Sequence, residues 1–587
     1  MVFININKKK NLEKEAITIK NINQTFLLPI TFSNNLYETP ENLLNDLELT
    51  KLKENPNKCL YDFVFKPKNQ LSSELLQQWN KYYTTNTLFL KDNQKLLKSL
   101  TLNPSFKEDQ LNNLYERWCN IKNDKDFKEK YLYVEWDYFD FLNKSPLFLE
   151  ILSLYTITSP VLSLLSPVLL LILHFFILKL NNNKITVKSY FFSLQTIFKS
   201  IPLGRIFDMK DMSFDKKIYS IISLFFYFLQ IYQNTQFCIK FKKNMSYIHD
   251  FINDLNNYLK NTIVYMNNFK EKAYNMVQFS KFNKILNDNK ENLIKLKKEL
   301  DKVTPLKINL SKVSNIGHVM KVFYELYDNS SYEESLIYSF GFNSYLENMF
   351  ELKKMINSKE INKCSFKVNK KTKIIDGYYA AINKKQAICN SYDLDKNIII
   401  TGPNAAGKTT ILKSTIFNIL LSQQIGFGFY KKAYINPYDY FHCYINIPDT
   451  AGRDSLFQAE SRRCKQIIDF ISNNSNKNHL CIFDELYSGT NPYEAVSSAY
   501  AYLKYINKFS NCKFLLTTHY IKLCNLIEDT DYIENYHMDV INDEDNFNYT
   551  YKLVKGISKI KGGIKVLHDL NYPKEIISET KSILNTL

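Results

Sequence analysis

The segment IITGPNAAGKTT, from Ile399 to Thr410, constrains the fold of this chain more than any other stretch. Its first residues are aliphatic, as in a buried strand, and the Gly-Lys-Thr near its end is typical of the start of a helix. The glycines between them allow backbone N–H groups to turn inward around phosphate oxygens. A strand, a glycine turn and a helix are the context that a P-loop requires, so the segment predicts a nucleotide-binding α/β fold.

The residues of this loop are suited to holding a nucleotide together with magnesium. The Lys408 ammonium is placed to reach the β- and γ-phosphates, and the Thr409 hydroxyl can ligate Mg²⁺. The predicted nucleotide-binding residues are those of the whole loop: Gly402, Pro403, Asn404, Ala405, Ala406, Gly407, Lys408, Thr409 and Thr410.

Two further strand-like segments end in polar residues that suit the same chemistry. CIFDE predicts a buried strand with Asp484 at its tip, where the carboxylate can hold magnesium through water. The next residue, Glu485, is placed to polarise the water that attacks the γ-phosphate. FLLTTH ends in His519, whose neutral imidazole can contact that phosphate. Because ligands bind at the carboxyl ends of strands in open α/β sheets, we expect these three side chains to converge on the loop.

The block from Asn397 to Pro573 resembles the ATPase domain of the MutS DNA mismatch-repair family. The family's TGPNxxGK[ST] loop is matched by TGPNAAGKTT, its DE strand by DELYSGTN, and its THY strand end by Thr518-His519-Tyr520. No LSGGQ-like signature of transporter-type ATPases is present. The resemblance implies a P-loop NTPase domain with a parallel sheet flanked by helices, and it implies ATP and Mg²⁺ as cofactors.

The resemblance extends to segments that carry no chemistry by themselves. QIGFGFYKKAYI is similar to the family's QIG segment, which implies a role for Gln424 at the cofactor site. DSLFQAE resembles the family's S-T-F-M-x-E signature, which implies that Ser455 reaches across a homodimer to the other subunit's nucleotide. The closing stretch follows the family's helical dimerisation element through Gly556, Gly563, Val566 and Pro573.

An uncharged stretch from Ile151 to Leu178 sets the middle of the chain apart. It is 28 residues long, and as a helix it measures about 42 Å, at about 1.5 Å per residue. That exceeds the roughly 30 Å hydrocarbon core of a bilayer. Pro160 and Pro167 predict either a kinked span or a short membrane hairpin. The alternative is a buried core helix of a large soluble domain, and the length of the stretch favours the membrane.

A second uncharged stretch, from Ile218 to Ile239, does not decide between membrane and core. The linker between the two stretches, from Lys179 to Lys217, holds eight basic and three acidic residues. The positive-inside tendency disfavours moving such a linker across a membrane, so a re-entrant or interfacial arrangement stays open.

The charge and cysteine content set weaker limits. The formal net charge of +17 suits a polyanionic partner, either nucleic acid or an anionic membrane surface. Coding bias is an equal explanation, because the chain is rich in Lys, Asn and Ile. Ten cysteines without metal-ligand spacing predict reduced thiols in a reducing compartment. The first residues, MVFININKKKNLEKEA, lack the apolar core of a signal peptide.

The predicted organisation has four parts. Residues 1–145 are a mixed, mostly helical region, 146–240 are apolar helices in a transmembrane or re-entrant insertion, and 241–350 are a helical lever or core region. Residues 351–587 are the MutS-like ATPase domain, with a dimerisation element at about 551–587. A motif similar to the mismatch readers' F-x-E, Phe323-Tyr324-Glu325, lies in VFYELYDN. It stands after a long helical segment rather than near the amino end, and its pattern is typical of a buried helix turn, so we interpret the match as coincidence.

Three hypotheses for the function follow. The favoured one is a homodimeric MutS-like ATPase of the mismatch-repair and DNA-damage-sensing type, in which ATP hydrolysis drives a clamp on double-stranded DNA. Its preference for mismatches is open. The second is a membrane-anchored MutS-derived ATPase without mismatch recognition, which tethers DNA or acts on a protein partner and keeps its ATPase domain in the cytosol. A soluble nuclear or cytoplasmic protein is the alternative location. The third is a nucleotide-bound scaffold, and intact Lys408, Asp484 and Glu485 argue against it.

Overall fold

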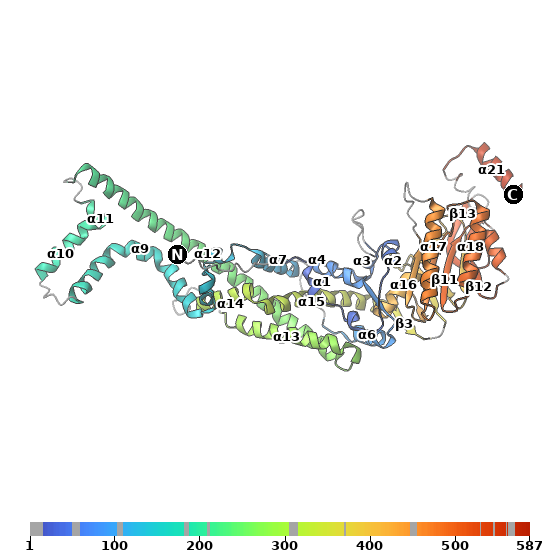
Figure 1. Cartoon of the computed structure of the whole chain (residues 1–587), viewed down its shortest axis with the longest axis horizontal. Helices are drawn as coiled ribbons and strands as arrows, with labels where there is room; N and C mark the ends of the chain where they lie inside the picture. The colour runs from blue at the N-terminus through green and yellow to red at the C-terminus, as the bar shows by residue number, and fades with distance from the viewer. Residues whose placement is uncertain are drawn as a thin grey trace, which may run out of the picture. The chain divides into compact units, whose positions relative to one another are not determined.

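The computed structural model describes residues 16–49, 59–102, 110–180, 187–207, 212–303, 315–368, 371–445, 455–528, 530–543, 546–558, 560, 567 and 570–586. The chain forms two compact units. Unit 1 comprises Met1–Thr18, Asn113–Ile263 and Lys290–Leu336, and unit 2 comprises Ile19–Asn112, Val264–Asn289 and Ile337–Leu587. Figure 1 follows the chain by colour from one end to the other.

The described part of unit 1 is helical. Its helices, some of which continue into unit 2, are α7 (Gln110–Asn123), α8 (Phe127–Lys130), η2 (Asp137–Lys144), α9 (Pro146–Leu180), α10 (Val187–Ser200), α11 (Pro202–Arg205), α12 (Phe214–Ala273), α13 (Ser280–Leu300), α14 (Ile316–Asp328) and the start of α15 (Ser330–Asn357). Aromatic rings hold its core together: the rings of Phe127 and Tyr327 stack with their centroids 3.9 Å apart, and Phe323 packs edge-on against Tyr131.

The Phe323-Tyr324-Glu325 motif lies inside this core. Phe323 is fully buried and Tyr324 is 1% exposed, both on α14. The Tyr324 hydroxyl donates to Asp140 at 2.6 Å, and the Lys321 ammonium lies 3.5 Å from the Glu325 carboxylate, one turn away on the same helix. The prediction of a buried helix turn is therefore confirmed. A ring that is enclosed by its own unit cannot wedge into DNA.

Both uncharged stretches are helical, as the sequence predicts. The first lies in α9, and the second forms the beginning of α12, a helix of 60 residues. Among the described residues, one helix is long and apolar enough to cross a membrane, namely Pro146–Leu170 of α9 with a mean hydropathy of 1.6. Of the 18-residue window that passes this test, 22% is buried.

Unit 2 contains a six-stranded sheet that positions the candidate site. Its order is β13-β12-β6-β11-β10-β9, and every neighbouring pair is parallel except the β12–β13 hairpin. A five-stranded sheet, in the order β5-β4-β8-β3-β7, belongs to the same unit. The strands are β1 (Leu36–Glu38), β2 (Tyr82–Thr84), β3 (Asn362–Phe366), β4 (Lys373–Gly377), β5 (Asn390–Asp393), β6 (Asn397–Thr401), β7 (Phe427–Gly428), β8 (Lys432–Ile435), β9 (Tyr440–Tyr444), β10 (His479–Asp484), β11 (Cys512–Thr518), β12 (Ile533–Asp543) and β13 (Asn546–Lys555).

Helices cover the faces of the six-stranded sheet. The helices of unit 2 are α1 (Asn21–Thr25), η1 (Pro29–Phe32), α2 (Glu41–Asp46), α3 (Leu60–Phe65), α4 (Gln70–Glu74), α5 (Leu76–Trp79), α6 (Thr87–Ser99), η4 (Val277–Phe279), α16 (Lys408–Ile425), α17 (Leu456–Asn473), α18 (Pro492–Ile506), α19 (Ile521–Ile527) and α21 (Lys574–Thr586). The helices α17, α18 and α19 pack on one face through a shared apolar cluster that includes Cys464, Ala499 and Cys524. The predicted α/β domain is therefore present, and it follows a largely helical region as expected.

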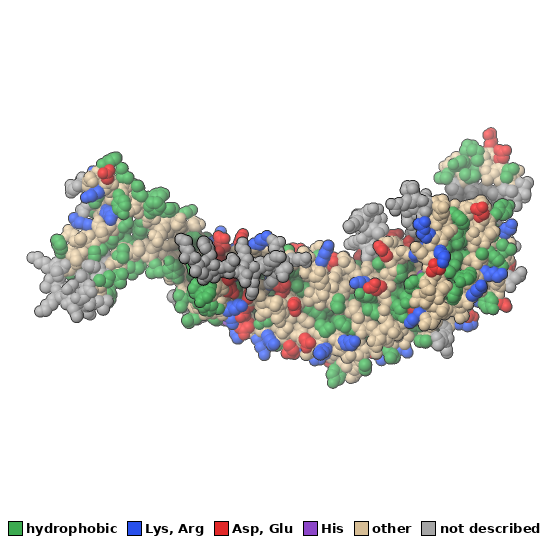
Figure 2. All heavy atoms as spheres, in the orientation of Figure 1, with side chains coloured by type: hydrophobic (Ala, Val, Ile, Leu, Met, Phe, Trp, Pro, Cys, Tyr) green, Lys and Arg blue, Asp and Glu red, His purple; other side chains and the backbone are tan. Residues whose placement is uncertain are grey.

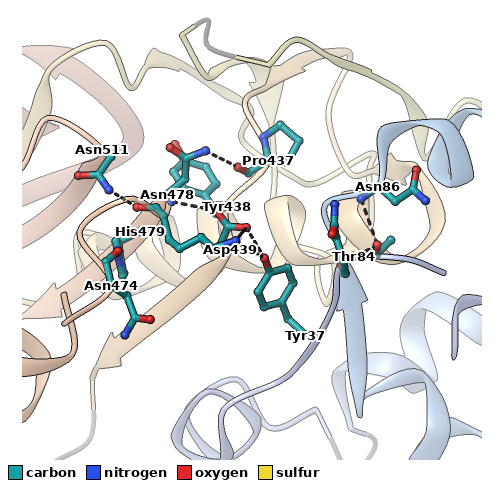
Figure 3. A network of polar contacts seen from close by, with 12 residues as sticks. Tyr37, Thr84, Asn86, Pro437, Tyr438, Asp439, Asn474, Asn478, His479 and Asn511 are labelled. Carbon is teal, nitrogen blue, oxygen red and sulfur yellow. Dashed lines mark hydrogen bonds and ion pairs between the residues drawn. The ribbon is translucent and has the colours of Figure 1, made fainter. Parts of the chain in front are cut away.

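Residues 19–112 fold into unit 2 rather than forming a separate region, and a polar network fixes them to the sheet (Figure 3). The Asp439 carboxylate, just before β9, accepts from the Tyr37 hydroxyl at 2.5 Å and from the Asn478 backbone N–H at 2.9 Å. The Tyr83 hydroxyl donates to the Asp439 carbonyl at 2.7 Å. Burial, and then the hydrogen bond to the Asp439 carboxylate, raise the pKa of Tyr37, so this hydroxyl keeps its proton and remains a donor.

Replacing Asp439 with alanine tests this attachment. The Asp439→Ala variant leaves the Tyr37 hydroxyl and the Asn478 N–H without their acceptor, so we expect the free energy of unfolding to fall by about 1–3 kcal/mol. Denaturant unfolding measures the loss. Asp469→Ala is the matched control, because Asp469 is an exposed aspartate on α17 whose one ion pair within the described residues is with Lys465 along its own helix. We expect a change within about 0.5 kcal/mol there, and equal losses in the two variants would contradict the role of the network.

Candidate active site

Three parallel strands bring the predicted site residues to one edge of the sheet. The strand β6 lies beside β11, and β11 lies beside β10. In the observed register Thr401 is opposite Thr518, and Asp484 is opposite Thr517. The P-loop follows the first of these strands, and Glu485 and His519 follow the other two. The predicted convergence of the three strand ends is therefore confirmed.

Two glycines shape the loop between β6 and α16. Gly402 has a φ of 154° and Gly407 has a φ of 90°, and residues with a Cβ rarely adopt such values. A Cβ on Gly407 would lie 3.2 Å from the Tyr551 ring. Because Gly407 is also the N-cap of α16, the first N–H groups of this helix face the loop and are available to an anion. This geometry fits the phosphates of a nucleotide.

Lys408 lies at the centre of the loop and is only 6% exposed. Its ammonium donates to the carbonyls of Gly402 and Pro403, each at 3.1 Å, and lies 3.1 Å from Nε2 of His519. Burial lowers the pKa of Lys408, and the charges of Glu485 and Asp484 oppose that shift. A buried ammonium held mainly by loop carbonyls has a strong electrostatic preference for an anion placed beside it.

Thr409 and Asp484 meet where the loop faces the tip of β10. The Thr409 hydroxyl donates to Oδ2 of Asp484 at 2.8 Å, and the Thr517 hydroxyl contacts the other carboxylate oxygen. A hydroxyl and a carboxylate side by side are hard oxygen ligands of the kind that Mg²⁺ takes together with phosphate oxygens. The predicted pair of magnesium residues is therefore assembled, and its chemistry fits the ion.

Glu485 and His519 form a hydrogen-bonded pair at the same edge. Nε2 of His519 lies 2.9 Å from Oε1 of Glu485, and this hydrogen bond is the main cause that lowers the pKa of Glu485. Glu485 also has a φ of 54°, which is uncommon for a residue with a side chain. Strained backbone of this kind persists where the surrounding structure holds a functional side chain in place.

A cleft of about 460 Å³ opens beside the loop. The loop residues line one side of it together with Glu485. Tyr379, Ile388, Met538 and Tyr551 are among the residues that line the rest, and the sequence did not point to them. Two of them come from the β12–β13 hairpin and another follows β4, so no local pattern pointed to them. The volume and the mixture of aromatic and polar walls suit a nucleotide.

Ser455 is exposed at the start of α17. Its hydroxyl accepts from the Gln458 N–H at 3.3 Å, and the Gln458 side chain accepts from the Ser455 N–H at 3.0 Å, which together form a capping box. A further residue of the DSLFQAE segment is buried: Glu460, 2% exposed, accepts from Ser488 and Gly489 just beyond Glu485. Sequence analysis missed Glu460, which ties α17 to the loop that carries Glu485.

Some predicted residues lie elsewhere. Gln424 is at the far end of α16 from the P-loop, and it is 1% exposed. Its amide donates to the Trp79 carbonyl at 2.8 Å and accepts from the Tyr61 hydroxyl at 2.7 Å, so the structure does not bring it to the cleft. Gly563 and Val566 of the predicted dimerisation element lie outside the described residues.

Comparison with known proteins points to the same part of the chain. The model of MutS domain V matches residues 398–587. The DNA mismatch repair protein MutS of Clostridium perfringens is 32% identical over 227 residues, which cover 37% of this chain and 24% of the relative. MutS of Halothermothrix orenii is 34% identical over 197 residues, covering 33% and 21%.

A third relative, MutS of Bacillus licheniformis, is 26% identical over 263 residues, which cover 41% of this chain and 30% of the relative. The chain therefore spans less than a third of the length of these curated relatives. MutS proteins are ATPases that bind DNA, and residues 398–587 contain both the matched region and the strand ends described above. Residues 398–587 are thus a MutS-like C-terminal domain, matched by the MutS domain V model and by the MutS relatives.

Proposed function

We propose that unit 2 binds ATP with Mg²⁺ and hydrolyses it to ADP and phosphate. The observation that carries the proposal is the meeting of Lys408, the Thr409–Asp484 pair and the Glu485–His519 pair at one sheet edge. A binding-only scaffold needs the loop and the lysine. Such a scaffold does not need an ionised carboxylate, whereas hydrolysis needs one to polarise the attacking water.

Each residue of the site has one role in this mechanism. Lys408 leaves the loop carbonyls and pairs with the β- and γ-phosphates. Magnesium held at Thr409 and Asp484 would neutralise charge on the phosphates. Glu485 polarises the water and accepts its proton while the water oxygen bonds to the γ-phosphorus. The bond from that phosphorus to the β–γ bridging oxygen breaks, and ADP leaves.

We further propose that the chain acts as a homodimer on double-stranded DNA. Ser455 supports the dimer, because its exposed hydroxyl stands in a segment similar to the family signature that completes the other subunit's site. The net charge of +17 supports contacts with DNA phosphates that do not depend on sequence. In this proposal ATP controls whether the dimer opens or closes around DNA, in mismatch repair or damage sensing as in the MutS relatives.

A specific observation favours a second candidate, a membrane-anchored ATPase derived from MutS. The segment Pro146–Leu170 of α9 is apolar, and only 22% of its 18-residue apolar window is buried. In this candidate the chain tethers DNA or acts on a protein partner, without reading mismatches. Its ATPase domain lies in a reducing cytosolic compartment, where its free cysteines stay reduced.

The Glu485→Gln variant tests hydrolysis. We expect ATP to bind with little change and the hydrolysis rate to fall by about 100-fold or more, because glutamine cannot accept the water's proton. Nucleotide binding and phosphate release measure the two effects separately. Glu528→Gln, an exposed glutamate after α19, is the control and should keep the wild-type rate. Unchanged hydrolysis in Glu485→Gln would remove Glu485 from the mechanism.

The His519→Ala variant tests how the Glu485 carboxylate is controlled. His519 lowers the pKa of Glu485, so the carboxylate stays ionised to a lower pH than a free glutamate. Without the imidazole, the acid side of the profile of kcat against pH should move to higher pH. A loss of rate at all pH values, with no movement of the profile, would contradict this role.

Mixing two inactive variants tests the dimer. Lys408→Ala removes the phosphate contact in its own subunit, and Ser455→Ala removes the proposed contact to the partner's nucleotide. In a mixed dimer one site keeps both groups, so we expect the ATPase rate to return to about a quarter of the wild-type rate. If Ser455 acts only as the cap of α17, mixing restores nothing.

Adding DNA to the ATPase assay separates the two candidates. The rate is measured without DNA, with matched duplex and with mismatched duplex, all at one salt concentration. A clamp on DNA predicts a change with duplex, and mismatch recognition predicts a larger change with the mismatched one. A rate that ignores both duplexes would favour the membrane-anchored candidate.

A further inference from the structure

The polarity of α9 is inverted relative to a helix in water. In the segment 150–170 the buried side chains are Ser153, Thr156, Ser159 and Ser163, each at most 9% exposed. The exposed side chains of this segment are aliphatic, apart from a tyrosine and a threonine: Ile151, Leu154, Tyr155, Ile157, Thr158, Val161, Leu162, Leu164, Leu165, Val168, Leu169 and Leu170. A helix in water turns apolar residues inward and polar residues outward. The exposed surface of α9 is therefore less polar than the stripe that it buries.

The beginning of α12 repeats this pattern in part, because Gln230, Gln233 and Gln236 are exposed there as well. Its large exposed side chains are Ile218, Tyr219, Ile221, Ile222, Phe225, Phe226, Phe228, Tyr232, Phe237 and Ile239. The buried residue among them is Ser220, 3% exposed. Figure 2 shows hydrophobic side chains gathered along these helices. Soluble proteins rarely expose a continuous apolar surface of this extent, and such a surface usually marks a site where another protein or a membrane binds.

Polar contacts join the two helices. The Asn234 amide donates to the Ser163 hydroxyl at 3.1 Å, and the Tyr227 hydroxyl donates to the Leu164 carbonyl at 2.9 Å. Helices in lipid associate through small residues and hydrogen bonds between helices, because lipid tails give apolar side chains no reason to cluster. The seam between α9 and α12 has this composition.

The two prolines of α9 are compensated within the helix. Pro160 and Pro167 leave the carbonyls of Thr156 and Ser163 without their usual N–H partners. The Ser159 hydroxyl donates to the first carbonyl at 3.0 Å, and the Ser166 hydroxyl donates to the second at 2.8 Å. Such compensation matters most where no water can reach the backbone.

Aromatic and basic side chains mark the base of this pair. Trp136, Tyr138 and Phe141 stand at or beside η2, directly before α9 in the chain, and are 73%, 84% and 63% exposed. Lys240, Lys242 and Lys243 are exposed on α12 directly after its uncharged stretch. Aromatic rings prefer the interface of a bilayer, and lysines prefer its anionic headgroups.

The base of α9 is fixed to the rest of unit 1. The Gly317 N–H, at the start of α14, donates to the Glu150 carboxylate at 2.6 Å. A Cβ on Gly317 would lie 2.1 Å from the Pro146 carbonyl oxygen, so the two helices meet closely. Insertion of the helical pair would therefore hold unit 1 at the membrane surface.

We infer that α9 and the first part of α12 form a hairpin that inserts into a phospholipid bilayer, with Trp136, Tyr138 and Phe141 at the headgroup level. This inference deepens the second candidate function and rests on it. The occupant is lipid rather than a second protein, because apolar side chains surround the pair and do not form a single face. Among the described helices only α9 is apolar enough by itself to cross a membrane. The uncharged part of α12, 22 residues long, measures about 33 Å as a helix, close to the roughly 30 Å of a hydrocarbon core.

Vesicle flotation of the full-length protein tests the inference. The chain is purified in detergent and mixed with neutral phosphatidylcholine vesicles, and the detergent is removed. We expect the protein to float with the vesicles at about 1 M salt, where electrostatic contacts are screened within about 3 Å. It should also resist alkaline washing. Release by salt or alkali would overturn insertion, because it would leave only binding at the surface.

Matched lysine variants locate the inserted surface. Val161→Lys with Val168→Lys places two charges on the exposed part of α9 and should lower the vesicle-bound fraction by about tenfold or more. Val277→Lys with Val368→Lys is the control, because these valines are 78% and 60% exposed outside the hairpin. The control should float like the wild type. Equal flotation of both double variants would overturn the inference.

Tryptophan fluorescence measures the depth. The chain has three tryptophans, and Trp79 and Trp118 are buried. Lipids brominated near the headgroup should therefore quench Trp136 alone, and Trp136→Phe should abolish the quenching.

If the protein stays off vesicles but sediments as oligomers that the α9 lysines dissociate, the occupant is a second copy and the inference fails.

ATP hydrolysis in the same samples separates the two proposals. Hydrolysis without flotation overturns the hairpin and leaves the ATPase proposal intact. Flotation without hydrolysis supports the hairpin and overturns the ATPase proposal.

Discussion

The burial of α16 is the constraint on which the described architecture of unit 2 depends. This helix is enclosed along almost its whole length. Its first residue, Lys408, lies in the P-loop, and its last turn holds Gln424 among residues of the N-terminal segment. A helix that is apolar or hydrogen-bonded on every side can only lie between layers. The candidate phosphate site and the segment 19–112 are therefore connected by one buried helix, which meets the site at its first residue and the segment at its last turn.

This arrangement fixes the N-terminal segment to the far end of the helix that begins at the P-loop. The Asn93 amide donates to the Ile425 carbonyl at 3.0 Å, and the Gln94 amide donates to the Gly426 carbonyl at 2.6 Å. Gly426 has a φ of 85° and ends the helix. The C-terminus of α16 is thus capped by side chains from α6. Any displacement of α16 at its phosphate end must either be absorbed within the helix or be passed to these contacts, because packed interiors deform little.

The sequence could predict the site where its chemistry is local. One strand ends in Asp484-Glu485 and another ends in His519. Their relative position can be predicted, because the ends of parallel strands align at one edge of the sheet. Gln424 shows the limit of this approach. Its place in a motif implied a role near the nucleotide, but its amide satisfies carbonyls from residues more than 340 positions earlier in the chain. Glu460 and the residues of β12 and β13 were missed for the same reason, since long-range packing places them.

The uncharged stretches show the same distinction. Length and the absence of charge predicted two apolar helices. They did not reveal that Ser153, Thr156, Ser159 and Ser163 occupy one buried stripe, because these residues read as weak interruptions of an apolar run. Only the exposure of each side chain shows that the apolar residues lie outside and the hydroxyls inside. The sequence thus predicted an apolar segment, and the structure shows which of its side chains face outward and which face inward.

A single nitrogen atom connects binding to hydrolysis at the candidate site. Nε2 of His519 lies 3.1 Å from the Lys408 ammonium and 2.9 Å from the Glu485 carboxylate. Toward lysine this nitrogen must accept a hydrogen bond, and toward glutamate it must donate one, so one tautomer cannot satisfy both. If Lys408 turns to a phosphate, the imidazole nitrogen is released to donate to Glu485 alone. Lys408, which would pair with the nucleotide phosphates, and Glu485, which would activate water, thus compete for the same imidazole nitrogen.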